Sequence, residues 1–150
     1  MANRSPLERK SDALAKLEAA ESNVWIASAS PAGLVHLVPV TNTWNGSHVV
    51  LATGPKSRTV ANVTANPRVR LALGDTRDVV MIDAVLIEAV PESEAPKAMA
   101  DGYATQAGWD PRTDSNDYVY LRFELERVQV WREAEDSAGR TVMRNGAWIV

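Results

Sequence analysis

The stretch from Ala52 to Thr59 has residue types suited to binding an anion. Thr53 and Ser57 can donate hydrogen bonds from their hydroxyl groups, and Lys56 and Arg58 add positive charge. Ser57 can also cap a short helix, whose first turn offers backbone amides without partners inside the helix. Together these groups predict a cradle for a phosphate or a similar anion. A capped helix start with solvated basic side chains explains the same residues, and this stretch alone does not separate the two interpretations.

Several common catalytic and nucleotide-binding signatures are absent. The eight glycines include no pair two residues apart, which excludes a G-x-G-x-x-G dinucleotide motif, and neither a G-x-x-x-x-G-K-[S/T] nor a G-x-S-x-G motif occurs. The chain has no cysteine, and its two histidines, His36 and His48, lack metal-pair spacing. We therefore expect no metal site. Both histidines lie in predicted strands, where a cross-strand position explains them better than a catalytic role.

Length and composition predict one domain spanning residues 1–150. Hydrophobic residues make up 45% of the chain and charged residues 23%, which excludes a largely disordered protein. A net charge of −3 argues against a general nucleic-acid binder, because such a protein needs a basic face. No stretch resembles a signal peptide or approaches the ~20 apolar residues of a membrane span. We expect a cytoplasmic protein with no membrane and no nucleic-acid partner.

Three segments are predicted to be helical. Ser5-Pro6-Leu7-Glu8 is a capping box with proline at the first helical position, and it predicts a helix from about Pro6 to Ala20. A short second helix follows Ser57 and ends at Asn66-Pro67. The third covers the alanine-rich segment Glu92–Ala104, with Pro96 in its first turn. The apolar face of the first helix is predicted to hold Leu7, Leu14 and Leu17.

Six segments have the β-branched and alternating apolar residues that are typical of strands. Asn45-Gly46 is a strong hairpin signal between two of them. This pattern predicts a mainly β (α+β) fold built from antiparallel meanders rather than an open parallel sheet. The predicted strands are Asn23–Ser30, Leu34–Trp44, Ser47–Thr53, Arg68–Leu73, Val79–Val90 and Tyr118–Trp131.

Two predicted strands and the C-terminal tail have apolar patterns that indicate how they are covered. Val79–Val90 is apolar on both faces, so both faces must be covered, one of them by a partner subunit. In Tyr118–Trp131 the apolar positions change from odd to even numbers, which predicts a bulge near Glu126-Arg127. The tail Gly139–Val150 contains Trp148 and other apolar residues that need a surface to dock on, which we expect near a ligand pocket or at a subunit interface. These features predict a homodimer.

The order of these elements resembles the FMN-binding split barrel of the pyridoxamine-5′-phosphate-oxidase superfamily, over about Leu17 to Trp131. The resemblance implies a six-stranded antiparallel split β-barrel with two or three peripheral helices. It also implies a bound FMN, or the deazaflavin F420, which short chains of this build often bind instead. The matching segments are Val24–Ala29, His36-Leu37-Val38-Pro39-Val40, the Asn45-Gly46 hairpin, Val49–Gly54, Lys56–Val63 and Asn66–Val69.

The resemblance also assigns cofactor-binding residues, and the chain departs from the family pattern in two places. Thr59 stands where the pyridoxamine-phosphate oxidases proper have a basic residue. Their C-terminal Trp and Arg, which bind the vitamin, have no assured match, although Trp131-Arg132 is a candidate. Oxidation of vitamin B6 is therefore not expected. The resemblance places Thr53, Ser57 and Arg58 near the cofactor phosphate with Lys56 beside them, and the backbone of Val38, Pro39 and Val40 against the ring.

By this resemblance the protein is a homodimeric FMN- or F420-dependent oxidoreductase that moves hydride between the cofactor and a small organic substrate. The cofactor supplies the chemistry in such enzymes, so no catalytic residue is assigned. A non-catalytic carrier of flavin or haem with the same fold is one alternative. A nucleic-acid-binding barrel using Lys56, Arg58, Arg68 and Arg70 is another. For F420, whose tail is acidic, Arg68, Arg70 or Arg77 are candidates to bind the tail, unless they are solvated charges.

Overall fold

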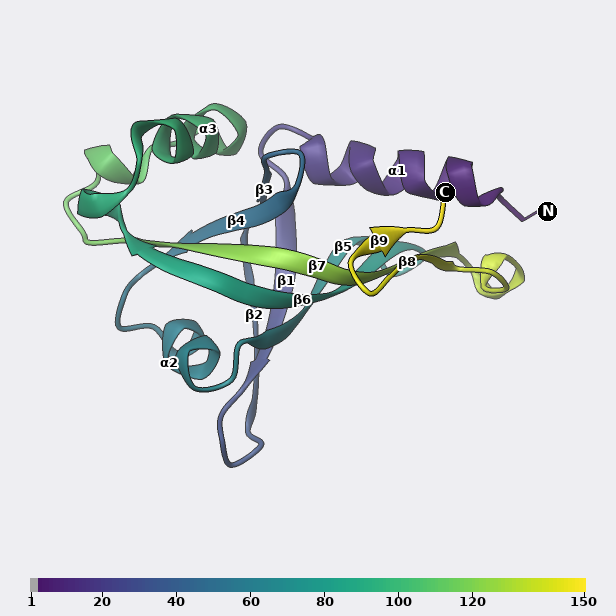
Figure 1. Cartoon of the computed structure of the whole chain (residues 1–150), viewed down its shortest axis with the longest axis horizontal. Coiled ribbons are helices and arrows are strands. Elements are labelled where there is room, and N and C mark those ends of the chain that lie inside the picture. The colour runs from purple at the N-terminus through teal and green to yellow at the C-terminus, as the bar shows by residue number, and fades with distance from the viewer. Residues whose placement is uncertain (1–2) are drawn as a thin grey trace.

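The computed structural model describes residues 3–150 as one strongly curled antiparallel sheet with helices at its periphery (Figure 1). The strands follow the order β2-β1-β5-β6-β7-β4-β3, with β8 added beside β7 and β9 beside β8. The sheet curls so far that β2, at one end, contacts β4 near the other. The predicted mainly β, antiparallel split-barrel architecture is confirmed. The sheet of the described residues has nine strands rather than the predicted six, because Leu34–Trp44 is divided into two strands and the tail adds two more. The strands are β1 (Asn23–Ala29), β2 (Val35–Thr41), β3 (Thr43–Trp44), β4 (His48–Thr53), β5 (Arg68–Asp75), β6 (Asp78–Pro91), β7 (Val119–Arg132), β8 (Thr141–Arg144) and β9 (Ala147–Trp148).

The three α-helices occupy the predicted regions with different bounds. They are α1 (Pro6–Glu18), α2 (Arg58–Ala65) and α3 (Lys97–Ala107). The prediction that Pro96 lies in the first turn of the third helix is wrong. Glu92–Glu94 forms a separate 3-10 turn, and Pro96 is the residue that precedes α3, so its ring does not interrupt the helical hydrogen bonds.

The inner face of α1 includes two of the three predicted leucines. The capping box is present, with the Glu8 amide donating to Ser5 Oγ at 3.1 Å. Leu17 is buried and Leu14 packs against the core, but Leu7 is 66% exposed. The buried residues Arg9, Ala13 and Leu17 are spaced by four and lie on one side of the helix, so this face also holds an arginine.

Arg9 belongs to a buried charge cluster that joins the N-terminus of α1 to the end of β7. Its guanidinium donates to the carbonyl oxygens of Val130 and Asp136 at 2.7 and 2.8 Å, and to Asp136 Oδ1 at 3.2 Å. Arg4 donates to Asp136 Oδ2 from Nη2 at 2.6 Å and also contacts Asp12. Because Arg9 is 1% exposed, its hydrogen bonds replace those that water would make.

Asp136 in this cluster makes stability depend on acid. Burial on its own would raise the pKa of Asp136, but hydrogen bonds from Arg4 and the Arg132 amide outweigh burial and lower the pKa to about 2. A carboxyl with a lowered pKa stabilises the fold above its unfolded pKa, near 3.9, and loses this contribution as pH falls toward 2. We expect wild type to lose more unfolding free energy than Asp136→Asn between pH 5 and pH 2, measured by urea unfolding. Parallel pH curves for the two proteins would contradict this assignment.

The bulge predicted near Glu126-Arg127 is confirmed. Asp83 of β6 pairs with Arg127, whereas the next residue, Ala84, pairs with Leu125, so Glu126 is the extra residue. Leu125 and Val128 are consequently both buried on either side of it. The bulge keeps the apolar side chains of a 14-residue strand directed into the core as the sheet curls.

The C-terminal tail forms the hairpin of β8 and β9, which extends the sheet beside β7. Val142 and Met143 are buried there, and Lys10 of α1 lies 5.2 Å from the centre of the Trp148 ring. Ile149 remains 49% exposed, so its expected burial is not observed within the chain. The tail therefore docks on β7 and α1.

Candidate functional site

The predicted cradle lies between the end of β4 and the start of α2. Ser57 is the N-cap of α2, and its Oγ accepts from the Val60 amide at 3.2 Å. Thr53 Oγ1 lies 3.5 Å from Ser57 Oγ. Lys56 and Arg58 flank Ser57 and are exposed. The structure thus brings together two hydroxyls, two cationic side chains and the start of a helix, which are the groups that bind a phosphate.

Arg58 has no carboxylate partner among residues 3–150. Most other arginines of the chain do, including Arg68 with Glu126 and Arg70 with Asp83. An exposed guanidinium that no carboxylate neutralises is free to bind an anion from solution. Arg58 therefore meets one requirement of an anion cradle.

A hydrogen bond between two buried polar side chains, Asn62 of α2 and Ser28 of β1, holds α2 in place, and neither residue was predicted as a site residue. Asn62 Nδ2 donates to Ser28 Oγ of β1 at 3.0 Å, and both side chains are buried. Thr59 is 4% exposed, so the residue that replaces the family's basic side chain faces the core. The spacing of Thr59, Asn62 and Val63 along α2 was the available signal for this buried face.

Strand β2 presents the residues predicted to face a cofactor ring. β2 is an edge strand of the described sheet. Its one side pairs with β1, and the backbone groups on its other side have no paired strand. Val38 and Val40 are half-buried and pack against the core, while Pro39 is exposed on the other face. Strand β2 also contacts β4, the strand that leads into the cradle.

A hollow of about 340 Å³ adjoins the cradle segment. Pro55 and Val60 line it together with Tyr118 near the start of β7. Two carboxylates, Glu92 and Asp117, also line it and disfavour an anion inside. The hollow therefore suits an uncharged ring better than a phosphate.

A second hollow, of about 370 Å³, lies beneath α3. Its lining includes Trp44, Met99 and Tyr103, and an ion pair between Arg122 and Glu88 at 3.1 Å stands at its edge. An apolar lining with a few polar groups is typical of sites for small organic molecules. His48 Nδ1 lies 3.5 Å from Arg122 Nη1, so this histidine takes a cross-strand position, as predicted.

The arginines proposed to bind an F420 tail are all engaged elsewhere. Arg68 and Arg70 form the ion pairs given above, and Arg77 contacts Glu133 at 2.7 Å. Arg132 likewise contacts Asp78 at 3.3 Å and Asp12 at 3.6 Å, so the candidate match to the family's vitamin-binding arginine is also paired. Arg68, Arg70 and Arg77 are thus solvent-exposed charges with carboxylate partners, and exposed ion pairs of this kind are weak.

The curled antiparallel sheet with helices at its periphery defines a split-barrel protein. The family model described as pyridoxamine 5'-phosphate oxidase matches residues 11–132. The chain belongs to this family. No curated protein matches the sequence.

Solved structures share the fold at low sequence identity. A conserved hypothetical protein from Mycobacterium tuberculosis is 21% identical, with 90% of this chain and 92% of that chain covered and a TM-score of 0.64. An F420 reductase is 16% identical over 76% of this chain and 94% of its own, with a TM-score of 0.60. A haem-binding protein from Mycobacterium smegmatis is 17% identical, covering 97% of this chain and 60% of its own, with a TM-score of 0.62. At these identities the comparisons show a common fold.

Among residues 3–150, no helix is long and apolar enough to cross a membrane. The same residues contain no group of three or more His, Asp or Glu side chains arranged to hold a metal ion.

Proposed function

We propose that the protein is an FMN- or F420-dependent oxidoreductase that transfers hydride to or from a small organic molecule in the cytoplasm. The observation that carries this proposal is Arg58, an arginine without a carboxylate partner beside the Ser57 cap of α2, in a barrel of the pyridoxamine-5′-phosphate-oxidase family. The cradle would hold the cofactor phosphate. The bound flavin or deazaflavin supplies the hydride chemistry.

The chain's own residues would bind and orient the cofactor. Thr53 and Ser57 would donate hydroxyl hydrogen bonds to the phosphate, and Arg58 with Lys56 would balance its charge. The free edge of β2 offers backbone donors and acceptors for the polar edge of a ring, except at Pro39, which has no N–H. This fit rests on unpaired cationic side chains and an unpaired strand edge, both of which a phosphorylated ring system would satisfy.

The direct test is the absorbance spectrum and mass of whatever co-purifies with the protein, followed by titration with FMN and with F420. An oxidoreductase should then turn over at least one member of a panel of quinones, enones, nitroaromatics and tetrapyrroles with reduced cofactor. Failure to bind either cofactor at micromolar concentration would contradict the proposal.

A flavin or haem carrier is the second candidate function. The shared fold with a haem-binding protein favours testing it, and a haem would need an axial ligand such as His36, which is half-buried on β2. Haem titration should give a Soret band that shifts in His36→Ala if this histidine is the ligand. Cofactor binding without turnover on the whole panel would favour the carrier.

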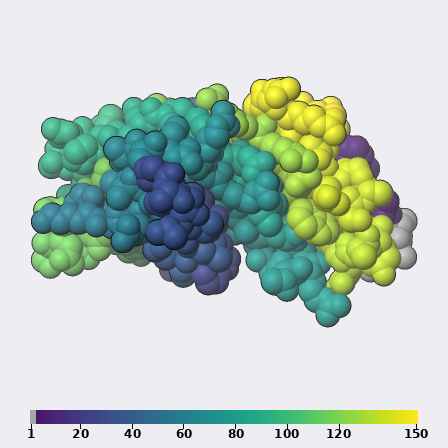
Figure 2. Space-filling view, turned by 90° about the horizontal axis from the view of Figure 1, so that it is seen from below, coloured from purple at the N-terminus to yellow at the C-terminus, as the bar shows by residue number. Residues whose placement is uncertain are grey.

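We also propose a homodimer. Strand β6 buries Val80 and Ile82 on its inner face, whereas Met81 and Val85 on its other face are only partly buried and Ile87 is 38% exposed. A more exposed apolar surface lies on β1 and β2, whose hairpin projects from the molecule (Figures 1 and 2), and we place the interface there. Proteins of this family are often dimeric. The exposed fractions on this face are 49% for Trp25, 76% for Val35 and 58% for Leu37.

Leu37→Glu should weaken this dimer, because burying an unpaired carboxylate in an apolar interface is costly. Light scattering at micromolar concentration should show a wild-type dimer and a variant shifted toward monomer, with a dissociation constant raised at least about tenfold. Leu7→Glu is the matched control, since Leu7 is equally exposed but lies on α1. A wild-type monomer, or equal effects of both substitutions, would contradict the proposed interface.

A further inference from the structure

The arginines that lack carboxylate partners are not spread evenly over the molecule. Among residues 3–150, they are Arg58 in the cradle and Arg127, Arg140 and Arg144. The last three lie together where β7 meets β8. In a chain whose acidic residues outnumber its basic ones, 19 to 16, carboxylates are available to pair with arginines. A cluster of arginines without carboxylate partners is therefore a specific feature of this surface.

The three arginines line one hollow of about 310 Å³. No aspartate or glutamate contributes to its lining, which also includes Gln129, Ser137 and Thr141. Gln129 Nε2 donates to Thr141 Oγ1 at 3.3 Å, which leaves the threonine hydroxyl hydrogen available as a donor. The hollow thus combines three guanidinium groups with neutral donors and has no negative charge of its own.

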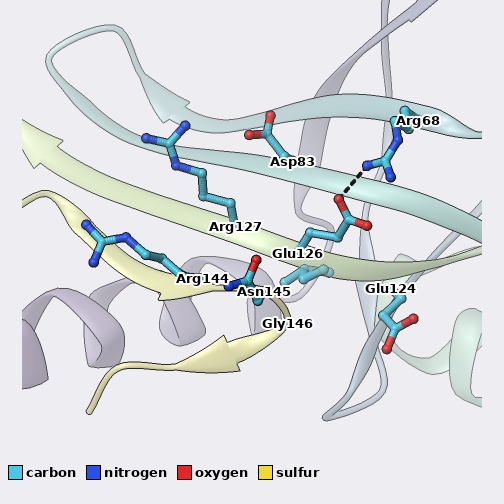
Figure 3. Close-up of a pocket in the computed structure, with 9 residues that line it drawn as sticks. Arg68, Asp83, Glu124, Glu126, Arg127, Arg144, Asn145 and Gly146 are labelled. Atoms are coloured by element: carbon cyan, nitrogen blue, oxygen red, sulfur yellow. Dashed lines mark hydrogen bonds and ion pairs between the residues drawn. The ribbon is translucent and has the colours of Figure 1, made fainter.

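Two of these side chains also reach a larger neighbouring hollow of about 680 Å³ (Figure 3). There, Arg127 and Arg144 point to the same side, away from Glu124 and from the ion pair of Arg68 and Glu126. Asp83, the cross-strand neighbour of Arg127, also lines this hollow; its Oδ1 accepts from Arg70 at 2.8 Å, and it forms no ion pair with Arg127. Arg140 is held in place by the Trp131 ring, 5.3 Å from its guanidinium carbon, and by a 3.4 Å bond to the Ser137 carbonyl oxygen.

This cluster is separate from the cofactor cradle and from the proposed dimer face. Thr53 of the cradle pairs with Val119 at the start of β7, and at about 3.3 Å per residue the strand runs roughly 25 Å from there to Arg127. Figures 1 and 2 show the C-terminal hairpin (yellow) at one side of the molecule and α2 toward the other. Strands β5 and β6 separate the cluster from β1.

We propose that Arg127, Arg140 and Arg144 form a second anion-binding site, for a small molecule carrying two or more negative charges. Three guanidinium groups around one hollow repel one another, and a multivalent anion removes this repulsion while accepting bidentate hydrogen bonds. Phosphate esters and polycarboxylates share this chemistry. The site is additional to the proposed oxidoreductase function and does not depend on it.

Isothermal titration with inorganic pyrophosphate and with citrate tests this site. Wild type should bind at least one of these anions, and Arg127→Gln/Arg144→Gln should bind it at least about tenfold more weakly, through loss of charge-assisted bonds. Arg140→Gln, which changes a residue outside the strands, should also weaken binding. Binding of pyrophosphate alone identifies a phosphate site, and binding of citrate alone a polycarboxylate site.

The control variant is Lys97→Gln/Arg112→Gln, which removes the same charge from an ion-paired cluster around Asp101 beside α3. It should bind the anion as wild type does. Equal binding by wild type and Arg127→Gln/Arg144→Gln would overturn the proposal. So would anion binding that disappears in Arg58→Ala alone, because the cradle would then be the site. Tighter binding of a single-stranded oligonucleotide than of either anion would show a nucleic-acid surface instead.

Discussion

Replacing Arg9 by alanine should destabilise the protein by about 3–5 kcal/mol, the range expected when one partner of a buried ion pair is removed. The guanidinium donates to the carbonyl oxygens of Val130, Asp136 and Ala138 in addition to the Asp136 carboxylate. Without it, these oxygens lose partners in a region that water reaches poorly. Urea unfolding at neutral pH measures the loss, which should appear as a lower midpoint with little change in the slope.

Arg77→Ala provides the matched control for this experiment. Arg77 also pairs with a glutamate, but its side chain is 78% exposed, and exposed ion pairs contribute little to stability. The control should therefore unfold at nearly the wild-type midpoint. If Arg9→Ala is no less stable than Arg77→Ala, the buried cluster does not hold α1 to the end of β7.

The long strands could be predicted from the sequence because their signals are local, whereas the short strands β8 and β9 of the tail were not predicted. Alternating apolar residues and the Asn45-Gly46 turn depend on neighbours within a few positions. The bulge at Glu126 could also be predicted, since the change from odd to even apolar positions is visible within a single strand. For the same reason the cradle around Ser57 was recognisable as a capped helix following a strand.

The features that the sequence did not predict depend on contacts between distant segments. Arg9 can be buried because it forms an ion pair with Asp136, which is distant in the sequence. No local pattern shows that an arginine will lie on the inner face of α1. The pairing of Arg68, Arg70 and Arg77 likewise depends on strand register. The structure therefore shows which arginines have carboxylate partners, and Arg58, Arg127, Arg140 and Arg144 have none among residues 3–150.

Arg58 has no carboxylate partner among residues 3–150 that would compete with a cofactor phosphate. Arg58→Ala should weaken cofactor binding by about one to two orders of magnitude, since a charge-assisted hydrogen bond contributes roughly 1.5–3 kcal/mol. Folding should be unaffected, because the side chain is exposed and makes no ion pair within residues 3–150. Titration with FMN and with F420, alongside a thermal melt, measures both effects.

Two further variants distinguish a phosphate cradle from a helix start that is merely capped. Ser57→Ala removes the bond to the Val60 amide and should cost about 1 kcal/mol of stability in either case. In a cradle it should also weaken cofactor binding, because Ser57 Oγ is one of the donors to the phosphate. Arg68→Ala removes an equally exposed arginine that is paired with Glu126, and it should leave cofactor affinity unchanged. If Arg58→Ala binds both cofactors as tightly as Arg68→Ala, the phosphate is held elsewhere, and the assignment of Thr53, Lys56, Ser57 and Arg58 is wrong.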